Sequence, residues 1–278
     1  MLANSPKVFG SKKATFWVQS KVSRLRQGFG NKRPRRPNPD SLPEPASKAG
    51  PVPVEDQTVS TPGVRLPILI SFYETYLADQ DTAHFLRNVQ QYYTQGTLQR
   101  LAEHPSPQIR RAAVLALGFL GDYEANATMG RALHDDDRTV RTLAENGIRS
   151  VWRRAGTPKQ QELLAVIVRL NESRRYQEAA QRASQLIAEA PWLAEAWNQR
   201  AIARFGMEDY AGTIEDCHQT LELNPYHFAA ATGMGHAYLR LNNPRSALES
   251  FRRALKLNPS LEAVRCQVVR LSRLIEGK

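Results

Sequence analysis

The sequence has few of the residues that build a reactive centre. Its 278 residues include two cysteines, Cys217 and Cys266, and neither is accompanied by a CxxC pair or a Cys/His spacing. Isolated cysteines of this kind favour buried structural thiols over ligands or nucleophiles. The Walker A, G-x-S-x-G and G-x-G-x-x-G motifs are also missing from the sequence. We therefore expect a protein that is not an enzyme and that has no cofactor and no metal site.

Long apolar runs are missing as well. A helix that spans a bilayer needs roughly 20 apolar residues, and the longest candidate, residues 66–72, already contains a proline and a serine. The N-terminal part has no apolar core followed by a small-residue cleavage site, and Arg35-Arg36 is followed by Pro-Asn-Pro, so secretory and twin-arginine signals are not expected. We expect a cytoplasmic protein that is soluble or peripheral to a membrane.

The first 39 residues lack acidic side chains and contain ten Lys or Arg, so the first forty carry +9 of the net charge of +11. Val18, Val22, Leu25 and Phe29 follow a helical spacing with basic residues between them. Three readings stay open for this tail: a solvated disordered terminus, a basic amphipathic helix on an anionic membrane surface or a partner, and an organelle transit peptide. The last of these predicts organelle import.

Residues 34–67 contain nine of the seventeen prolines and show no hydrophobic period. Such a composition cannot bury enough apolar surface to offset chain entropy, which predicts an extended linker. We therefore assign residues 1–66 to a disordered basic tail with a Pro-rich linker, and we expect the ordered part to begin near Pro67.

The C-terminal part contains one 34-residue unit twice. Positions that correspond at this offset are Trp197 and Ala231, Ala201 and Gly235, Tyr210 and Pro244, Thr213 and Ala247, Cys217 and Phe251, and Leu-Glu-Leu-Asn-Pro at 221–225 with Leu-Lys-Leu-Asn-Pro at 255–259. A fixed period of this length is typical of a solenoid, in which each helix pair buries its apolar face on its neighbours.

These units resemble the tetratricopeptide (TPR) repeat family. The positions that carry the resemblance are Trp197, Ala201, Tyr210 and Pro225 in unit 194–227, and Gly235, Tyr238, Ala247, Phe251, Ala254 and Pro259 in unit 228–261. Small residues fit where two helices cross, and each closing proline ends a unit. Residues 160–193 form a degenerate third unit, so the TPR region covers 157–261. Residues 262–278 follow as a capping helix whose outer side is polar, with Arg265, Arg270 and Arg273.

A second period, of 31 residues, precedes the first. It aligns Ser106-Pro107-Gln108-Ile109-Arg110 with Asp137-Arg138-Thr139-Val140-Arg141, and it resembles the HEAT-like repeat family. We assign residues 67–156 to HEAT-like helical repeats, which begin with helices over 67–78 and 82–93. Ser106, Asp137 and Thr157 are expected to cap helices, and Gly118 and Gly121 are expected to mark the end of the first unit. The acidic run His134-Asp135-Asp136-Asp137 fits helix-start electrostatics better than a cation site.

No linker separates the two repeat types. The sequence therefore predicts an all-α fold: a right-handed α-solenoid of stacked antiparallel helix pairs, HEAT-like and then TPR, in one continuous stack over 67–278.

The family resemblance implies a peptide-binding groove lined by the first helix (helix A) of each TPR unit. Its positions correspond here to Asn198, Gln199, Ile202 and Phe205, to Thr232, His236, Leu239 and Arg240, and to Arg270 and Arg273 of the capping helix. The Lys and Asn set that some family members use for a C-terminal carboxylate is absent. The arginines still suit an acidic or C-terminal segment.

The sequence favours a non-enzymatic scaffold or adaptor that binds a protein or peptide partner. A nucleic-acid-binding solenoid that uses the basic tail is the alternative, and it predicts affinity that falls steeply with salt. An accessory subunit of a lyase or assembly complex is a further alternative.

Overall fold

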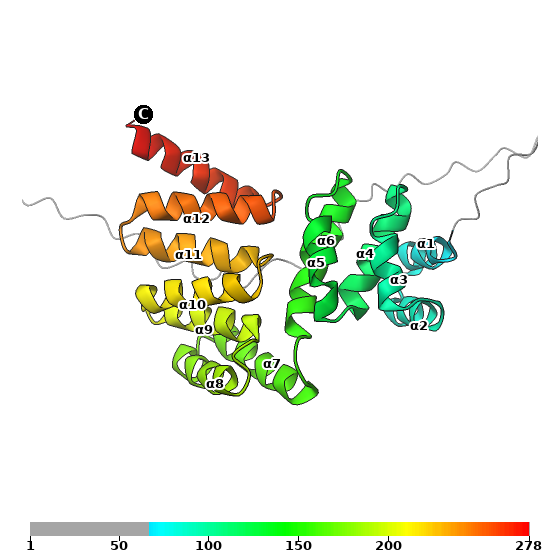
Figure 1. Ribbon diagram of the computed structural model, residues 1–278, viewed down its shortest axis with the longest axis horizontal. Helices are drawn as coiled ribbons and strands as arrows, with labels where there is room; N and C mark the ends of the chain where they lie inside the picture. The colour runs from blue at the N-terminus through cyan, green and yellow to red at the C-terminus, as the bar shows by residue number, and fades with distance from the viewer. Residues whose placement is uncertain (1–66, 278) are drawn as a thin grey trace, which may run out of the picture. The chain divides into compact units, whose positions relative to one another are not determined.

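The computed structural model describes residues 67–277, and the regular structure of this range is entirely helical. The predicted all-α fold is confirmed. The tail helix, the Pro-rich linker and the other expectations for residues 1–66 lie outside the described residues. In chain order the helices are α1 (Leu69–Asp79), α2 (Thr82–Tyr92), α3 (Gln95–Leu101), α4 (Pro107–Leu120), the 3₁₀ helix η3 (Tyr123–Ala125), α5 (Asn126–Ala132), α6 (Arg138–Arg153), α7 (Pro158–Glu172), α8 (Tyr176–Glu189), α9 (Ala194–Gly206), α10 (Tyr210–Leu223), α11 (Phe228–Arg240), α12 (Pro244–Leu257) and α13 (Glu262–Glu276) (Figure 1).

Helix starts follow the predicted caps in two of three cases. The Asp137 carboxylate accepts a hydrogen bond from the Val140 N–H at 2.9 Å, and Thr157 forms a capping box with Gln160. Ser106 occupies the N-cap position before Pro107, but its side chain makes no capping bond. Its backbone N–H donates instead to Nδ1 of His104 at 3.0 Å. The position of this cap was predicted correctly, and its hydrogen bond was not.

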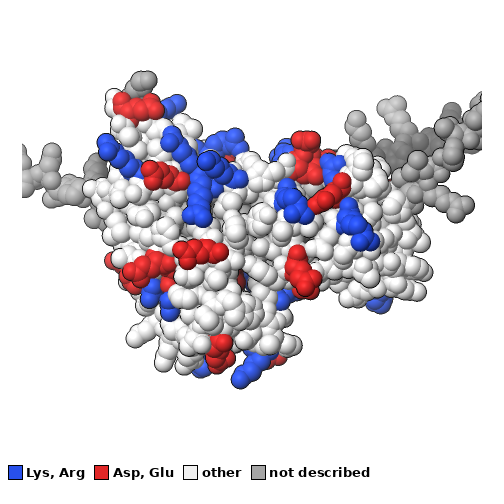
Figure 2. Space-filling model, viewed as in Figure 1, with Lys and Arg blue, Asp and Glu red and all other residues white. Residues whose placement is uncertain are grey.

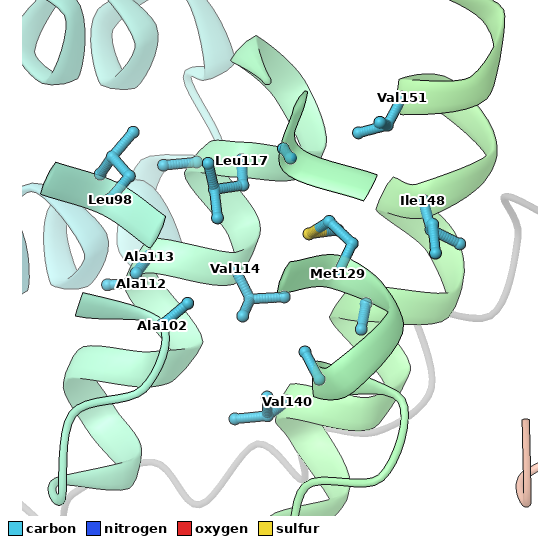
Figure 3. Packing of buried hydrophobic residues seen from close by; sticks show 14 of the residues in the cluster. Leu98, Ala102, Ala112, Ala113, Val114, Leu117, Met129, Val140, Ile148 and Val151 are labelled. Atoms are coloured by element: carbon cyan, nitrogen blue, oxygen red, sulfur yellow. The ribbon is translucent and has the colours of Figure 1, made fainter. Parts of the chain in front are cut away.

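The HEAT-like helices share one apolar core. Figure 3 shows Met129 of α5 lying between Val114 of α4 and Ile148 of α6, and all three side chains are fully buried. Bidentate ion pairs tie α4 to the loop before α6. The Arg110 guanidinium donates to both Asp135 carboxylate oxygens at 2.7 Å, and Arg111 contacts Asp137 in the same way. The carboxylates of the acidic run at residues 134–137 therefore hold α4 and α6 together.

We expect Asp137→Asn to lower the free energy of unfolding by about 1 kcal/mol at pH 7, after allowance for solvent screening of the pair. The hydrogen bonds from Arg111 and from the Val140 N–H hold the pKa of the Asp137 carboxyl at about 2, below its ordinary value of 3.8. Because the folded-state pKa is the lower one, the carboxylate stabilises the fold above about pH 4 and loses this effect as the pH falls towards 2.

Urea unfolding of both chains between pH 7 and pH 2 measures this difference, which should vanish at the acid end. Glu103→Gln is the matched control, because the Glu103–Arg131 pair is more than half exposed and should contribute little. If the difference in free energy of unfolding between Asp137→Asn and the original chain stayed constant with pH, the lowered pKa of Asp137 would be contradicted.

In the TPR region four of the predicted repeat positions lie in the core. Ala201, Ala247, Phe251 and Ala254 are fully buried in a core formed by α9 to α13. A Cβ atom added at Gly235 would lie 2.6 Å from the Phe251 ring, so only glycine allows this contact. The small residues therefore stand where helices approach closely.

Helix α13 packs on α12 through Val264 and Leu271, as expected for a capping helix. Its outer side is less polar than predicted. Arg265, Arg270 and Arg273 are exposed, but Val269 is 47% exposed and Leu274 is 64% exposed beside them. The helix therefore presents a mixed surface of arginine and aliphatic side chains.

The structure differs from one uninterrupted stack at the junction of the two repeat types. Helices α7, α8 and α9 form a second core, which includes Ala179 and Leu186, and Ala155 and Tyr123 of the HEAT-like region pack into its edge. The HEAT-like core instead takes in Phe228 of α11, with Tyr226 and Leu257 packed against it. The second HEAT-like unit therefore packs on the loops that precede α11 and α13, and α6 also contacts α7 and α9.

Polar contacts reinforce this docking. The Trp152 indole stacks on the His227 ring at 4.0 Å between centroids, and its Nε1 donates to Oδ1 of Asn126 at 2.8 Å. The Asn126 amide in turn donates to Oδ1 of Asn224 at 2.9 Å. All four side chains are buried. The two repeat regions are thus fixed to each other by contacts between residues far apart in the chain.

Candidate functional site

The candidate site is the surface of helices α9 and α11 at the predicted groove positions, together with Arg270 and Arg273 of α13. We call it the helix-A face, and it comprises Asn198, Gln199, Ile202, Phe205, Thr232, His236, Leu239, Arg240, Arg270 and Arg273. The helices that carry it lie in one packed series, because α9 contacts α10 and α11, α11 contacts α12, and α12 contacts α13. Not all ten residues are equally available to a ligand.

Two of the predicted groove residues are buried. Asn198 and Gln199 are each 4% exposed, and both donate to Oε1 of Glu195, at 3.2 and 2.7 Å. Gln199 also accepts from the Asn171 amide of α7. These two amides hold neighbouring helices together and offer little surface to a partner.

Glu195 is the centre of a buried polar cluster that sequence reasoning did not identify. Its second carboxylate oxygen lies 2.9 Å from Nε2 of His227, whose Nδ1 accepts from the Ala230 N–H. Because Nδ1 accepts, Nε2 carries the proton and donates to the carboxylate. Burial alone would raise the pKa of Glu195, but the hydrogen bonds from His227 and Gln199 outweigh it, and this pKa lies below its usual range. The hydrogen bonds of the Glu195 carboxylate are thus structural, although Oδ1 of Asn198 is buried without a partner within residues 67–277.

The partly exposed end of the face is aromatic and basic. Phe205 of α9 and Tyr210 of α10 meet edge to face with ring centroids 5.4 Å apart. The Arg240 guanidinium of α11 lies 5.0 Å from the Tyr210 ring centroid and 3.5 Å from the Glu208 carboxylate. Successive repeats thus join in a surface of the kind that protein interfaces favour, with aromatic rings beside arginine.

The remaining residues of α11 are half-buried. The Thr232 hydroxyl donates to the Phe228 carbonyl at 2.9 Å, and the His236 ring meets Phe251 edge to face at 5.1 Å. Leu239 packs against the core of α9 to α13. Ile202 of α9 is half-buried as well. These side chains line the face without projecting far from it.

The α12–α13 end of the chain is basic. Figure 2 shows Lys and Arg side chains gathered over these two helices. The exposed members are Arg245, Arg252, Arg253, Lys256, Arg265, Arg270 and Arg273. Arg270 and Arg273, the two that belong to the helix-A face, have no acidic partner within ion-pair distance among residues 67–277. They are available to an anionic group.

Residues 67–277 contain few side chains suited to nucleophilic or metal chemistry. Cys217 is fully buried at its packing position, and burial raises the pKa of its thiol above the usual range. Cys266 is a free, exposed thiol on α13. Within residues 67–277 no three His, Cys, Asp or Glu side chains are grouped to hold a metal ion. None of the helices in that range has the length and apolar character to cross a membrane.

Family comparisons match both repeat types. The HEAT repeat family matches residues 94–185, and the tetratricopeptide repeat family matches residues 229–261. The HEAT match extends over α7 and most of α8, which we assigned to the degenerate TPR unit. The boundary near residue 157 therefore stays a prediction.

Two curated proteins are similar over part of the chain. A TPR repeat-containing protein of Rhizobium etli is 29% identical over 132 residues, which are 48% of this chain and 65% of the relative. Subunit 7 of the anaphase-promoting complex of Dictyostelium discoideum is 31% identical over 88 residues, 30% of this chain and 15% of the relative. The chain thus spans just under two thirds of the first relative and a small part of the second.

Solved structures with partial likeness are TPR domains. The first TPR domain of Spaghetti (RPAP3), bound to an HSP90 peptide, aligns with 44% of this chain and 96% of its own, at 21% identity and a TM-score of 0.42. The TPR2AB domain of yeast Sti1 aligns with 73% of this chain and 95% of its own, at 17% identity and a TM-score of 0.39. The two family matches and the repeat packing show that the chain contains HEAT-like repeats followed by tetratricopeptide repeats.

Proposed function

We infer that this chain is a non-enzymatic scaffold that binds an acidic peptide segment of another protein along the helix-A face. The observation that carries this proposal is the surface formed by Phe205, Tyr210 and Arg240, where successive TPR units join aromatic rings and a guanidinium. Aromatic residues and arginine are the residue types that dominate binding energy at protein interfaces.

The charge of the α13 end supports an acidic segment. Arg270 and Arg273 are exposed and carry no ion pair among the described residues, so a partner's carboxylates would not have to displace an existing one. Guanidinium groups bind carboxylates through two parallel charge-assisted hydrogen bonds. The repeat family matched at residues 229–261 supports the same surface, because that unit contains α11 and α12.

Selection from a random peptide library against the whole chain tests this proposal. We expect binders enriched in Asp and Glu, and we expect Arg240→Ala with Arg270→Ala to weaken the best binder about tenfold, which is about 1.4 kcal/mol. Fluorescence anisotropy of the labelled peptide measures the affinity. The loss arises because both guanidinium groups contact the peptide.

Arg182→Ala with Arg245→Ala is the control, because it removes the same charge from exposed positions of α8 and α12 outside the helix-A face. Affinity should stay within about twofold of the original chain. Equal losses for both double variants would indicate general charge attraction, and selection of no peptide at all would remove the proposal.

A further inference from the structure

Arg149 of α6 has no carboxylate within ion-pair distance among residues 67–277. Its Nε atom is buried and has no hydrogen-bond partner in residues 67–277, and no ion pair in that range includes its guanidinium. The guanidinium carbon lies 4.8 Å from the centroid of the Phe228 ring. Arginine carries five N–H donors, and a buried donor without an acceptor destabilises the fold. The outer two nitrogens are not among the buried atoms, so the guanidinium has free donors that a partner's acceptor can reach.

The charged groups around Arg149 do not supply this acceptor. Glu145 on α6 and Glu195 on α9 attract the guanidinium from beyond ion-pair distance, and Arg153 repels it. Burial outweighs these effects and lowers the pKa of Arg149 from its ordinary value. The Glu195 carboxylate is already occupied by hydrogen bonds from His227, Gln199 and Asn198.

The position of Arg149 is at the edge of the helix-A face. Phe228, on whose ring the guanidinium rests, is the first residue of α11, and its carbonyl accepts from Thr232 of the face one turn later. The residue is partly exposed, and Nε is the only one of its side-chain nitrogens that is buried without a partner, which leaves the outer two for a ligand. The HEAT-like region thus places a cation beside the TPR surface.

We propose that Arg149 binds the side-chain carboxylate of an acidic residue in the peptide that the helix-A face carries. This inference rests on the proposed function and extends it, because a helix outside the TPR units then helps select the peptide. A side chain fits better than a chain end, because Arg149 contacts α11, which lies between α9 and α13 in the packed series and not at its end. The planar guanidinium binds such a carboxylate with two parallel hydrogen bonds.

The Nε–H resonance of Arg149 in the nitrogen-15-labelled full chain tests this directly. Its signal is assigned by its loss in Arg149→Lys. Three tripeptides at constant ionic strength serve as probes: acetyl-Gly-Glu-Gly-amide, acetyl-Gly-Gly-Gly with a free C-terminus, and acetyl-Gly-Gln-Gly-amide. We expect a saturable shift with the glutamate peptide at a dissociation constant of about 1 mM, and no shift with the glutamine peptide.

Arg149→Lys keeps the charge but not the planar guanidinium, so it should lower the affinity for the glutamate peptide at least about fivefold. The shift of the Thr232 amide resonance measures this affinity. Arg253→Lys on α12 is the matched control and should change nothing. Equal shifts with the glutamate and glutamine peptides, no shift with either, or a shift with the free C-terminus alone would each overturn the proposal. Library peptides that still bind the helix-A face in that case would leave the proposed function intact.

Discussion

Trp152→Ala is expected to lower the free energy of unfolding by about 3–5 kcal/mol, the range for deleting a buried large aromatic side chain. Trp152 is 2% exposed and stacks on His227 at 4.0 Å, with the Phe228 ring 5.3 Å away. The substitution removes these contacts and opens a cavity between α6 and α11. It also removes the indole donor from the buried Asn126 carbonyl oxygen, which adds the cost of an unpaired acceptor.

Urea unfolding followed by far-ultraviolet circular dichroism measures this change. Trp192→Ala is the matched control, because Trp192 is 54% exposed and its loss should stay within about 0.5 kcal/mol. Trp152→Phe should fall between the two, since it keeps most of the apolar contact but not the indole N–H. A loss below about 1 kcal/mol for Trp152→Ala would contradict the docking of the HEAT-like region on the TPR loops.

The sequence predicted the repeat units because their signals are local. A capping residue contacts an N–H three residues later, as Asp137 does with Val140, and a helical period reports which side of one helix is apolar. The contact between Trp152 and His227 has no such signal. Its partners are 75 residues apart, each sits in a different repeat type, and a period describes only how a unit meets its neighbour.

The same limit applies to the candidate site. Family positions placed Asn198 and Gln199 on the groove, but Glu195 on the same helix turns both amides inward to satisfy its buried carboxylate. An acidic residue at the start of a helix is ordinarily exposed, so its sequence position did not indicate burial. Arg149 was missed for a related reason, since it belongs to a HEAT-like helix and reaches the TPR surface only through the docking of α6.

Gly118 is a further position where the sequence prediction was wrong. We expected it to end the first HEAT-like unit, whereas it lies inside α4 and is buried. Its Cα faces Gly147 of α6, and a Cβ atom added at Gly147 would lie 2.6 Å from the Gly118 Cα. Two glycines therefore let the backbones of α4 and α6 touch. A glycine in a helix can mark an end or a crossing, and only the partner helix distinguishes the two.

Gly147→Ala is therefore expected to destabilise the chain by about 2–3 kcal/mol, although alanine is the better helix former by about 1 kcal/mol. The added methyl group meets backbone atoms of α4, which cannot move aside as a flexible side chain would. The two helices must separate, and the apolar core around Met129 must loosen with them. Urea unfolding, under the conditions used for Trp152→Ala, measures the change.

Gly96→Ala in α3 is the matched control, because no atom lies within 4 Å of a Cβ built there. Alanine at this position should leave the stability unchanged or raise it by up to about 1 kcal/mol. Since both variants make the same chemical change in a helix, a difference in sign between them separates the close approach of α4 and α6 from helix propensity. If Gly147→Ala were as stable as the original chain, the two helices would not be in backbone contact, and the core on which the HEAT-like region positions Arg149 and Trp152 would be packed differently.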